Sequence, residues 1–455
     1  MTTEGRSECL DAFVIALNQA CDGQAKRWYA STLELQLVSL EFCGACRSVQ
    51  TLHVRIDGQT PRSLWSPRTS QITASGRRRE VCISSRVPAV QAYGVTWGRR
   101  YLSAARLRSV IWPVGLKRLM FSVDTAVNVV SWPASLERLS FGPFFNQPIA
   151  DVVWPVSLQQ LSFGSLFNQN IAEAVWPVSL QQLSFGWAFN QPIAGVVWPV
   201  SLQQLSFGYE FNQPIIRVEW PASLQQLLFQ KKFSQPIAGV VLPASLQRVS
   251  FGDDFNHHIT DVVWPASLQQ ISFGDNFNQP IADVVWPVGM QQISFGSSFN
   301  QNITEVVWPA SLQKLSFRKK FNQPFAGVVW PVSMQELSFG PCFNQPIVGV
   351  VWPDSLQQLL FRTKFNQPIA GVVWPASLQQ LSFGRKFNQP ISDVEWPASL
   401  QQLSFGDNFN QPISDVEWPA CLKQLSFGVG FEQSVDEVVW PASLQSVTRG
   451  GESLL

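Results

Sequence analysis

The chain of 455 residues is poor in charge, in histidine and in long apolar runs. Only 14% of its residues are charged and the formal net charge is +1, so neither nucleic acid nor a membrane surface is an expected partner. Its three histidines, and the lack of a recognisable serine or cysteine nucleophile motif, leave nothing from which to build a catalytic triad. No apolar run approaches the roughly 18 residues that a membrane helix needs. We therefore expect no enzyme, no cofactor and no membrane span.

The pattern of cysteines and the lack of a signal-peptide pattern near the start favour a reducing, intracellular compartment. The seven cysteines are odd in number and irregularly spaced, which argues against a disulfide framework and favours a reducing environment. The apolar stretch near the start is short, follows Asp11, and has no basic run and cleavage site of the kind a signal peptide carries. We expect an intracellular, cytoplasmic protein.

The chain contains a sequence repeat, and most of its 19 Trp and 33 Phe residues lie in the copies of that repeat. The stretch WPASLQQLSFGDNFNQPISDVE covers residues 396–417, and Trp-Pro recurs every 22 residues from Trp132 to Trp440, with Leu242-Pro243 filling one gap. A fixed period of this length containing Leu-x-x-Leu-x-apolar is typical of leucine-rich coils. The sequence predicts a β-rich repeat solenoid of leucine-rich-repeat type, with short parallel strands stacked in about 15 coils.

The columns of the repeat predict which side chains face inward. In SLQQLSF at 157–163, the apolar Leu161 and Phe163 flank the small polar Ser162, which predicts a short strand with one buried face. Before each Trp, the residue two positions back is nearly always Val, while the position between them accepts Glu, as at Glu395. We therefore expect a second extended segment whose Val and Trp are core.

Asparagine recurs in the segment Phe167-Asn168-Gln169-x-Ile171 and its copies, except at Ser234 and Glu432. Phe and Ile of this segment are predicted core. Asn at one corner of every coil could form a ladder by bonding the backbone amides of the next coil. Alternatively, it could merely tolerate the geometry of a turn.

The repeat resembles the FNIP-repeat class of leucine-rich repeats. LPASLQRVSFGDDFNHHI at 242–259 carries the pattern, and copies with Trp as the first residue extend over about 132–447. The resemblance implies a leucine-rich-repeat solenoid used for protein–protein interaction. Some members carry an F-box or a kinase domain beside the repeats. The chain lacks a kinase Gly-rich loop and catalytic loop, and its first hundred residues lack the Leu-Pro opening of an F-box, so neither role is transferred.

The two ends of the chain differ from the repeat. Apolar spacing predicts a helix near 7–21, and the patterns at 37–42 and 49–54 predict degenerate strands of an N-terminal α/β cap. At the other end, Arg449 stands where Phe belongs, which would blunt an open strand edge. The expected organisation is a capping region, 1–100, a solenoid, 101–449, and a tail, 450–455.

Three groups of residues could carry other chemistry, each with a plainer interpretation. Cys43 and Cys46, with His53 and Cys82, could bind zinc, but irregular spacing favours ordinary cap cysteines. His257-His258 could bind a metal, although a variant turn explains them as well. Arg77–Arg79 could bind phosphate or act as a nuclear localisation signal; alternatively, they belong to a solvated loop without a binding role. We expect no metal site.

The positions that vary are the two residues before each Phe-Asn, which follow the strand where leucine-rich repeats contact partners. Two groups of residues at and beside these positions are either binding surfaces or random drift at solvated sites. Four successive coils offer an aromatic cluster: Phe144, Leu166, Trp187 and Tyr209. Later coils offer a basic patch: Arg318, Lys319, Lys320, Arg362, Lys364, Arg385 and Lys386.

The sequence favours a monomeric, non-enzymatic scaffold that binds a partner protein through exposed strand and post-strand positions. The alternative is a substrate-recognition adaptor, for example of a ubiquitin ligase, in which residues 1–100 recruit other machinery.

Overall fold

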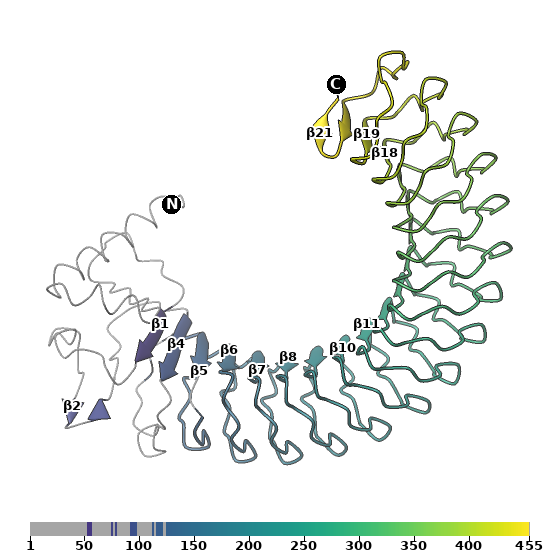
Figure 1. Cartoon of the computed structure of the whole chain (residues 1–455). Coiled ribbons are helices and arrows are strands. Elements are labelled where there is room, and N and C mark those ends of the chain that lie inside the picture. Colours follow the sequence, from purple (N-terminus) through teal and green to yellow (C-terminus); the bar gives the residue numbers. More distant parts are fainter. Residues whose placement is uncertain are drawn as a thin grey trace, which may run out of the picture. The chain divides into compact units, whose positions relative to one another are not determined.

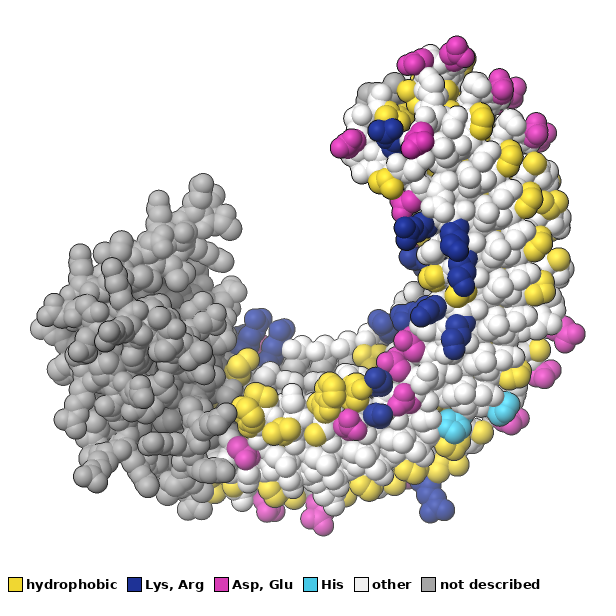
Figure 2. All heavy atoms as spheres, in the orientation of Figure 1, with side chains coloured by type: hydrophobic (Ala, Val, Ile, Leu, Met, Phe, Trp, Pro, Cys, Tyr) yellow, Lys and Arg dark blue, Asp and Glu magenta, His cyan; other side chains and the backbone are white. Residues whose placement is uncertain are grey.

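The structure, a computed structural model, describes residues 112, 115–121 and 124–454, together with four short N-terminal strands (Figure 1). The chain divides into two units, Met1–Tyr209 and Glu210–Leu455, and each is described by itself. The expected helix near 7–21 and strand at 37–42 lie outside the described residues. The described part contains no helix, and therefore none that could cross a membrane. Most of its visible surface is uncharged; Lys and Arg side chains gather in a few places, whereas Asp and Glu side chains are scattered (Figure 2).

The first unit is a stack of parallel strands. Strand β1, which overlaps the strand expected at 49–54, pairs with β4, and β4 through β9 then pair in chain order, all in parallel. The small antiparallel pair β2–β3 stands apart from this sheet. The strands are β1 (Leu52–Ile56), β2 (Ala74–Ser75), β3 (Arg78–Arg79), β4 (Ala92–Trp97), β5 (Arg118–Phe121), β6 (Arg138–Phe141), β7 (Gln160–Ser162), β8 (Gln182–Ser184) and β9 (Gln204–Ser206).

The second unit repeats the arrangement from β10 to β20 and ends in an antiparallel strand, β21. Its parallel strands keep the period of the sequence, since each strand residue pairs with the residue 22 positions later, as Ile271 pairs with Ile293. The strands are β10 (Gln226–Leu228), β11 (Arg248–Ser250), β12 (Gln270–Ser272), β13 (Gln292–Ser294), β14 (Lys314–Ser316), β15 (Glu336–Ser338), β16 (Gln358–Leu360), β17 (Gln380–Ser382), β18 (Gln402–Ser404), β19 (Gln424–Phe427), β20 (Ser446–Arg449) and β21 (Glu452–Ser453).

The strands form as predicted because their two faces differ. In β13, Ile293 is fully buried, while Gln292 and Ser294 on the other face are half-buried. The segment before each Trp also alternates as expected: Val394 is buried and Glu395 is exposed. It is not a strand, because the proline that follows each Trp lacks the N–H that a ladder needs.

Each coil packs its core on a copy of the same core. The two phenylalanines of one coil stack at 4.0 Å between ring centroids, as Phe295 and Phe299 do. Each then stacks on its counterpart in the next coil, Phe295 on Phe317 at 5.5 Å and Phe299 on Phe321 at 6.1 Å. Identical letters recur because a ring must fit its own copy one coil away. The Trp column is mostly buried, as predicted, and Trp286 is 6% exposed.

The asparagine ladder is confirmed. Oδ1 of Asn278 accepts a hydrogen bond from the backbone N–H of Asn300 at 2.8 Å, and Nε2 of Gln301 donates to the carbonyl oxygen of Asn278 at 2.9 Å. Asp124 supplies the same acceptor to Asn146 at one end. Because the recipient offers only its backbone N–H, Glu432 can take that place without breaking the ladder.

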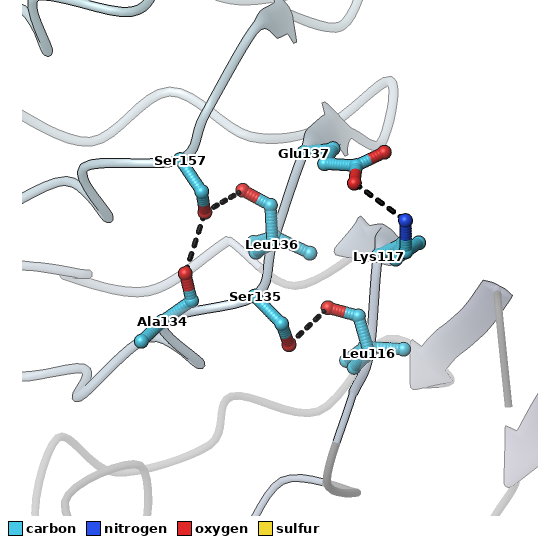
Figure 3. Close-up of polar contacts among 7 residues, drawn as sticks. All are labelled: Leu116, Lys117, Ala134, Ser135, Leu136, Glu137 and Ser157. Carbon is cyan, nitrogen blue, oxygen red and sulfur yellow. Dashed lines mark hydrogen bonds and ion pairs between the residues drawn. The ribbon is translucent and has the colours of Figure 1, made fainter. Parts of the chain in front are cut away.

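A serine column, which the sequence reasoning did not single out, adds a second ladder (Figure 3). Oγ of Ser157 donates to the carbonyl oxygen of Leu136 at 2.7 Å, and Oγ of Ser135 donates to that of Leu116 at 2.8 Å. The short serine side chain carries a hydroxyl donor that reaches a backbone acceptor in the preceding coil. Together with the asparagines, these bonds satisfy backbone groups at two corners of the coil.

At the C-terminal end, the strand edge is covered as well as charged. Arg449, expected to blunt the edge, pairs with Glu452 of β21, and Nη1 of Arg449 donates to the carbonyl oxygen of Phe431 at 3.3 Å. Gly450 and Gly451, with φ of 59° and 91°, make the reversal between the two strands. β21 thus lies within the segment expected as a tail.

Candidate interaction surfaces

The post-strand positions form turns that stack through backbone atoms. The N–H of Ala188 donates to the carbonyl oxygen of Ser165 at 2.8 Å, and the N–H of Lys386 donates in the same way to Thr363. Since this ladder uses no side-chain atom, these two positions can change residue type without disturbing the stack. This is the physical reason why they vary while their neighbours repeat.

The aromatic cluster lies on these turns in the first unit. Phe144, Leu166 and Trp187 are 64%, 50% and 54% exposed, and Tyr209 is half-buried. The rings of Trp187 and Tyr209 stack with 3.9 Å between centroids and 6° between planes. The structure therefore brings the two predicted aromatic residues into direct contact and leaves the cluster accessible.

The basic patch lies on and beside the same turns in the second unit, where Lys and Arg side chains gather in Figure 2. All seven of its residues are exposed. Nη1 of Arg318 lies 3.4 Å from Oδ1 of Asp275, and Nε of Arg385 lies 3.4 Å from Oδ2 of Asp407. The other five form no ion pair with any described residue: Lys319, Lys320, Arg362, Lys364 and Lys386.

The pKa of the Asp275 carboxyl lies below its ordinary value. Oγ of Ser297 donates to Oδ1 of Asp275 at 2.8 Å, and this hydrogen bond is the main cause that lowers the pKa of Asp275. The backbone N–H of Ser297 and the charge of Arg318 lower it further, against an opposing effect of burial. Asp275 therefore stays ionised and fixes one edge of the basic patch.

A shallow groove of about 370 Å³ runs over the strand face from β16 to β20. Polar side chains line most of it, including Gln380, Ser382 and Ser404. Leu360 interrupts the lining, because it stands in the column that serine fills in β15 and β17. The strand face thus offers hydrogen-bonding groups beside one half-buried aliphatic side chain.

The histidines and cysteines considered as metal ligands form no metal site among the described residues. His257 stands in the place of the repeat's glutamine, and its Nε2 lies 2.9 Å from the carbonyl oxygen of Ser234. Within 115–121 and 124–454, no three His, Cys, Asp or Glu side chains are placed to hold a metal ion. The side chains of Cys43, Cys46, His53 and Cys82, and of Arg77–Arg79, lie outside the described residues.

One exposed column was not singled out as a surface from the sequence. Val263, Val285 and Val307, each in the position before Trp, are 83%, 80% and 78% exposed. The signal was present, since the same column accepts Glu at Glu219 and Glu395. Nothing in the described residues covers these valines.

Comparison with known proteins decides the family. The FNIP repeat model matches ten segments, overlapping or adjoining, that together span residues 145–429. The chain belongs to the FNIP-repeat family. A solved structure described as CroV588, a novel circular leucine-rich-repeat protein, is similar to this FNIP chain at 42% identity and a TM-score of 0.72. The match covers 81% of the FNIP chain and 54% of CroV588, so the FNIP chain spans about half the length of that protein.

Two further solved structures show much lower similarity to the FNIP chain. An internalin from Listeria monocytogenes matches at 12% identity and a TM-score of 0.45, over 69% of the FNIP chain and 86% of the internalin. A chain of the Toll–Spatzle complex of Drosophila matches at 11% identity and a TM-score of 0.47, over 75% of the FNIP chain and 54% of the chain in that complex. No curated protein matches. The fold is a leucine-rich-repeat solenoid of stacked parallel strands.

Proposed function

We propose that this FNIP chain is a non-enzymatic scaffold that binds a partner protein through exposed strand and post-strand positions. Leucine-rich-repeat solenoids commonly serve as protein-interaction scaffolds, and the proposal extends that role to this chain as an intracellular monomer. The observation that carries this proposal is that the post-strand turns stack through backbone hydrogen bonds and do not need their side chains for it. Their backbone atoms hold the stack together, as in the bond from Ala188 to Ser165, and their side chains remain available.

The aromatic cluster is the surface that we assign to the partner. Trp and Tyr are among the residue types that dominate binding hot spots. Stacking already restricts Trp187 and Tyr209, so a partner that covers them loses less side-chain entropy than one that must order two free rings. Elsewhere the same turn positions carry mainly charged, small or polar residues, so the apolar group is a local departure.

The test replaces the cluster by residues that the repeat itself uses. Trp187→Ser with Tyr209→Ser introduces the residue found in the turn of Ser297 and Ser298, and therefore keeps the backbone ladder. Affinity purification from cells, quantified by mass spectrometry, should lose the main partner of the wild-type chain. Retention of that partner at wild-type level would assign the binding surface elsewhere, with the strand face next.

The adaptor function is a second proposal, favoured by the break in composition near residue 100. Residues 1–108 are net basic and lack the repeat, whereas the remainder of the chain is net acidic. Residues 1–100 used as bait should capture ubiquitin-ligase components if the chain is an adaptor. A bait that captures none of them leaves the scaffold as the only supported function.

A further inference from the structure

We propose that the basic patch of the second unit binds a short acidic segment of a partner protein, with one aliphatic residue of that segment against Leu360. The inference rests on the proposed scaffold function, but it concerns a different surface from the aromatic cluster. It names the chemistry of a partner segment that this surface fits.

Charge is the first observation. Arg318 and Arg385 already face carboxylates at 3.4 Å, whereas the other five cations of the basic patch have no ion-pair partner among the described residues. Like charges held on neighbouring coils repel one another, and an anionic ligand relieves that repulsion. The unpaired members are Lys319, Lys320, Arg362, Lys364 and Lys386.

The shape of the patch comes from the coil in its middle. The N–H of Cys342 donates to the carbonyl oxygen of Lys319 at 3.1 Å, and the N–H of Lys364 donates to that of Pro341 at 2.9 Å. The Pro341–Cys342 turn therefore lies directly between two cationic turns. The side chains of Pro341 and Cys342 are small and half-buried. A carboxylate can therefore approach the surface at this turn and lie between the cations of the two adjacent turns.

The carboxylates at its ends limit the length of the ligand. Asp275 lies on one side of the patch and Asp407 on the other, and both would repel an anion that extended past them. The coils of Lys319 and Lys386 are three steps apart, or about 14 Å at roughly 4.8 Å per strand. An extended peptide covers that distance with about four to five residues at roughly 3.3 Å each.

Leu360 supplies the aliphatic contact. It is half-buried at the edge of the groove, it ends β16, and it lies two residues before Arg362. Ser338 and Ser382 hold the same place in the adjacent strands. An acidic segment that places one Leu or Ile here would bury apolar surface while its carboxylates face the cations.

The same observations favour a protein segment over nucleic acid. Single-stranded nucleic acid binds on aromatic side chains as well as cations, and the turns of the patch contain no aromatic residue. A longer polyanion would also meet Asp275 and Asp407. Binding of an oligonucleotide is therefore an outcome that the experiment must be able to detect.

The experiment measures binding of a fluorescein-labelled peptide, Glu-Glu-Leu-Glu-Glu, to the full chain by fluorescence anisotropy at two salt concentrations. We expect saturable binding that weakens with salt. Lys319→Ser, Lys320→Ser and Lys364→Asn together copy residues that the repeat uses in these columns, and should weaken binding at least tenfold. Lys232→Ser removes a lysine on a turn outside the patch, where Nζ lies 3.5 Å from Oδ2 of Asp254. This control variant should change the affinity for the peptide less than twofold.

Two further arms locate the site. Leu360→Ser restores the common residue of its column and should weaken binding of the leucine peptide, but not of Glu-Glu-Ser-Glu-Glu. Bound peptide should slow alkylation of Cys342 and leave exposed Cys421 unaffected, as followed by peptide mass spectrometry. Unchanged affinity in the triple variant, equal protection of both thiols, or tighter binding of a charge-matched single-stranded oligonucleotide would overturn the proposal. None of these results would alter partner capture by the aromatic cluster, so the two proposals fail separately.

Discussion

The indole ring of Trp187 lies parallel to the phenol ring of Tyr209, with 3.9 Å between ring centroids and 6° between planes. The two residues are 22 positions apart and occupy the turns of adjacent coils. Within this pair the side chain of Trp187 remains 54% exposed. A pair that is formed before a partner arrives presents a fixed apolar surface.

The first prediction concerns the energy of this pair. In a double-mutant cycle of Trp187→Ser and Tyr209→Ser, the coupling free energy of unfolding should be about 0.5–1.5 kcal/mol, the usual value of an aromatic pair beyond its buried area. Urea denaturation of the four proteins measures it. A coupling free energy of zero would mean that the rings do not stack in solution.

The second prediction concerns the asparagine ladder. Asn278→Ala removes the acceptor of the Asn300 N–H and should cost about 1–3 kcal/mol, because a donor inside the stack is left unpaired. Asn278→Asp keeps an acceptor, as Asp124 does naturally, and should cost less. Hydrogen exchange at Asn300 should accelerate in the alanine variant alone. Equal exchange in the two variants would contradict a role for the side-chain oxygen.

The third prediction separates two adjacent residues by burial. Trp286→Ala should cost about 3–5 kcal/mol and lower hydrogen-exchange protection across the neighbouring coils, because it opens a cavity. Val285→Ser, at a position 80% exposed, should change the free energy of unfolding by less than about 0.5 kcal/mol. Unchanged protection over 264–308 in the tryptophan variant would show that the Trp column is not core.

The fourth prediction concerns pH. Because the native pKa of Asp275 is lowered, its ionised form stabilises the native state at neutral pH. That contribution is lost as the pH falls through the ordinary aspartate range and below the native pKa. Asp275→Asn should therefore be less stable than the wild type at neutral pH, by at most about 1 kcal/mol for so exposed a pair, and equal to it in acid. A difference that persists in acid would assign the effect to packing.

The sequence predicted well which columns of this fold point into the core, but it did not predict the rotamers of long exposed side chains. The alternation of Leu161, Ser162 and Phe163 was enough to predict a strand, because successive side chains of a strand point to opposite faces of the sheet. Asn recurring at one corner predicted the ladder. Yet nothing in the repeat spacing indicated that Arg318 would reach past one coil to Asp275, since the rotamer of a long side chain is not fixed by its column.

Two features of the candidate surfaces were missed, each for its own physical reason. The sequence placed Trp187 near Tyr209, but the parallel stack depends on rotamers that the structure supplies. The stacking of turns through backbone atoms, as between Ala188 and Ser165, has no sequence signature, because any residue with an N–H can form it. Only the tolerance of these positions for many residue types indicated that their side chains are not needed for the stacking of the turns. The expected boundaries of the capping region, the solenoid and the tail stay a prediction.

The central claim is that repeated columns hold the fold and non-repeated turns bind the partner. The most direct measurement compares the wild type with a variant in which Phe144, Leu166, Trp187 and Tyr209 are all replaced by serine, using thermal melting together with quantitative affinity purification. The account predicts a melting temperature lowered only by the loss of the ring stack, and loss of the main captured protein. Capture at wild-type level by a folded variant would contradict it.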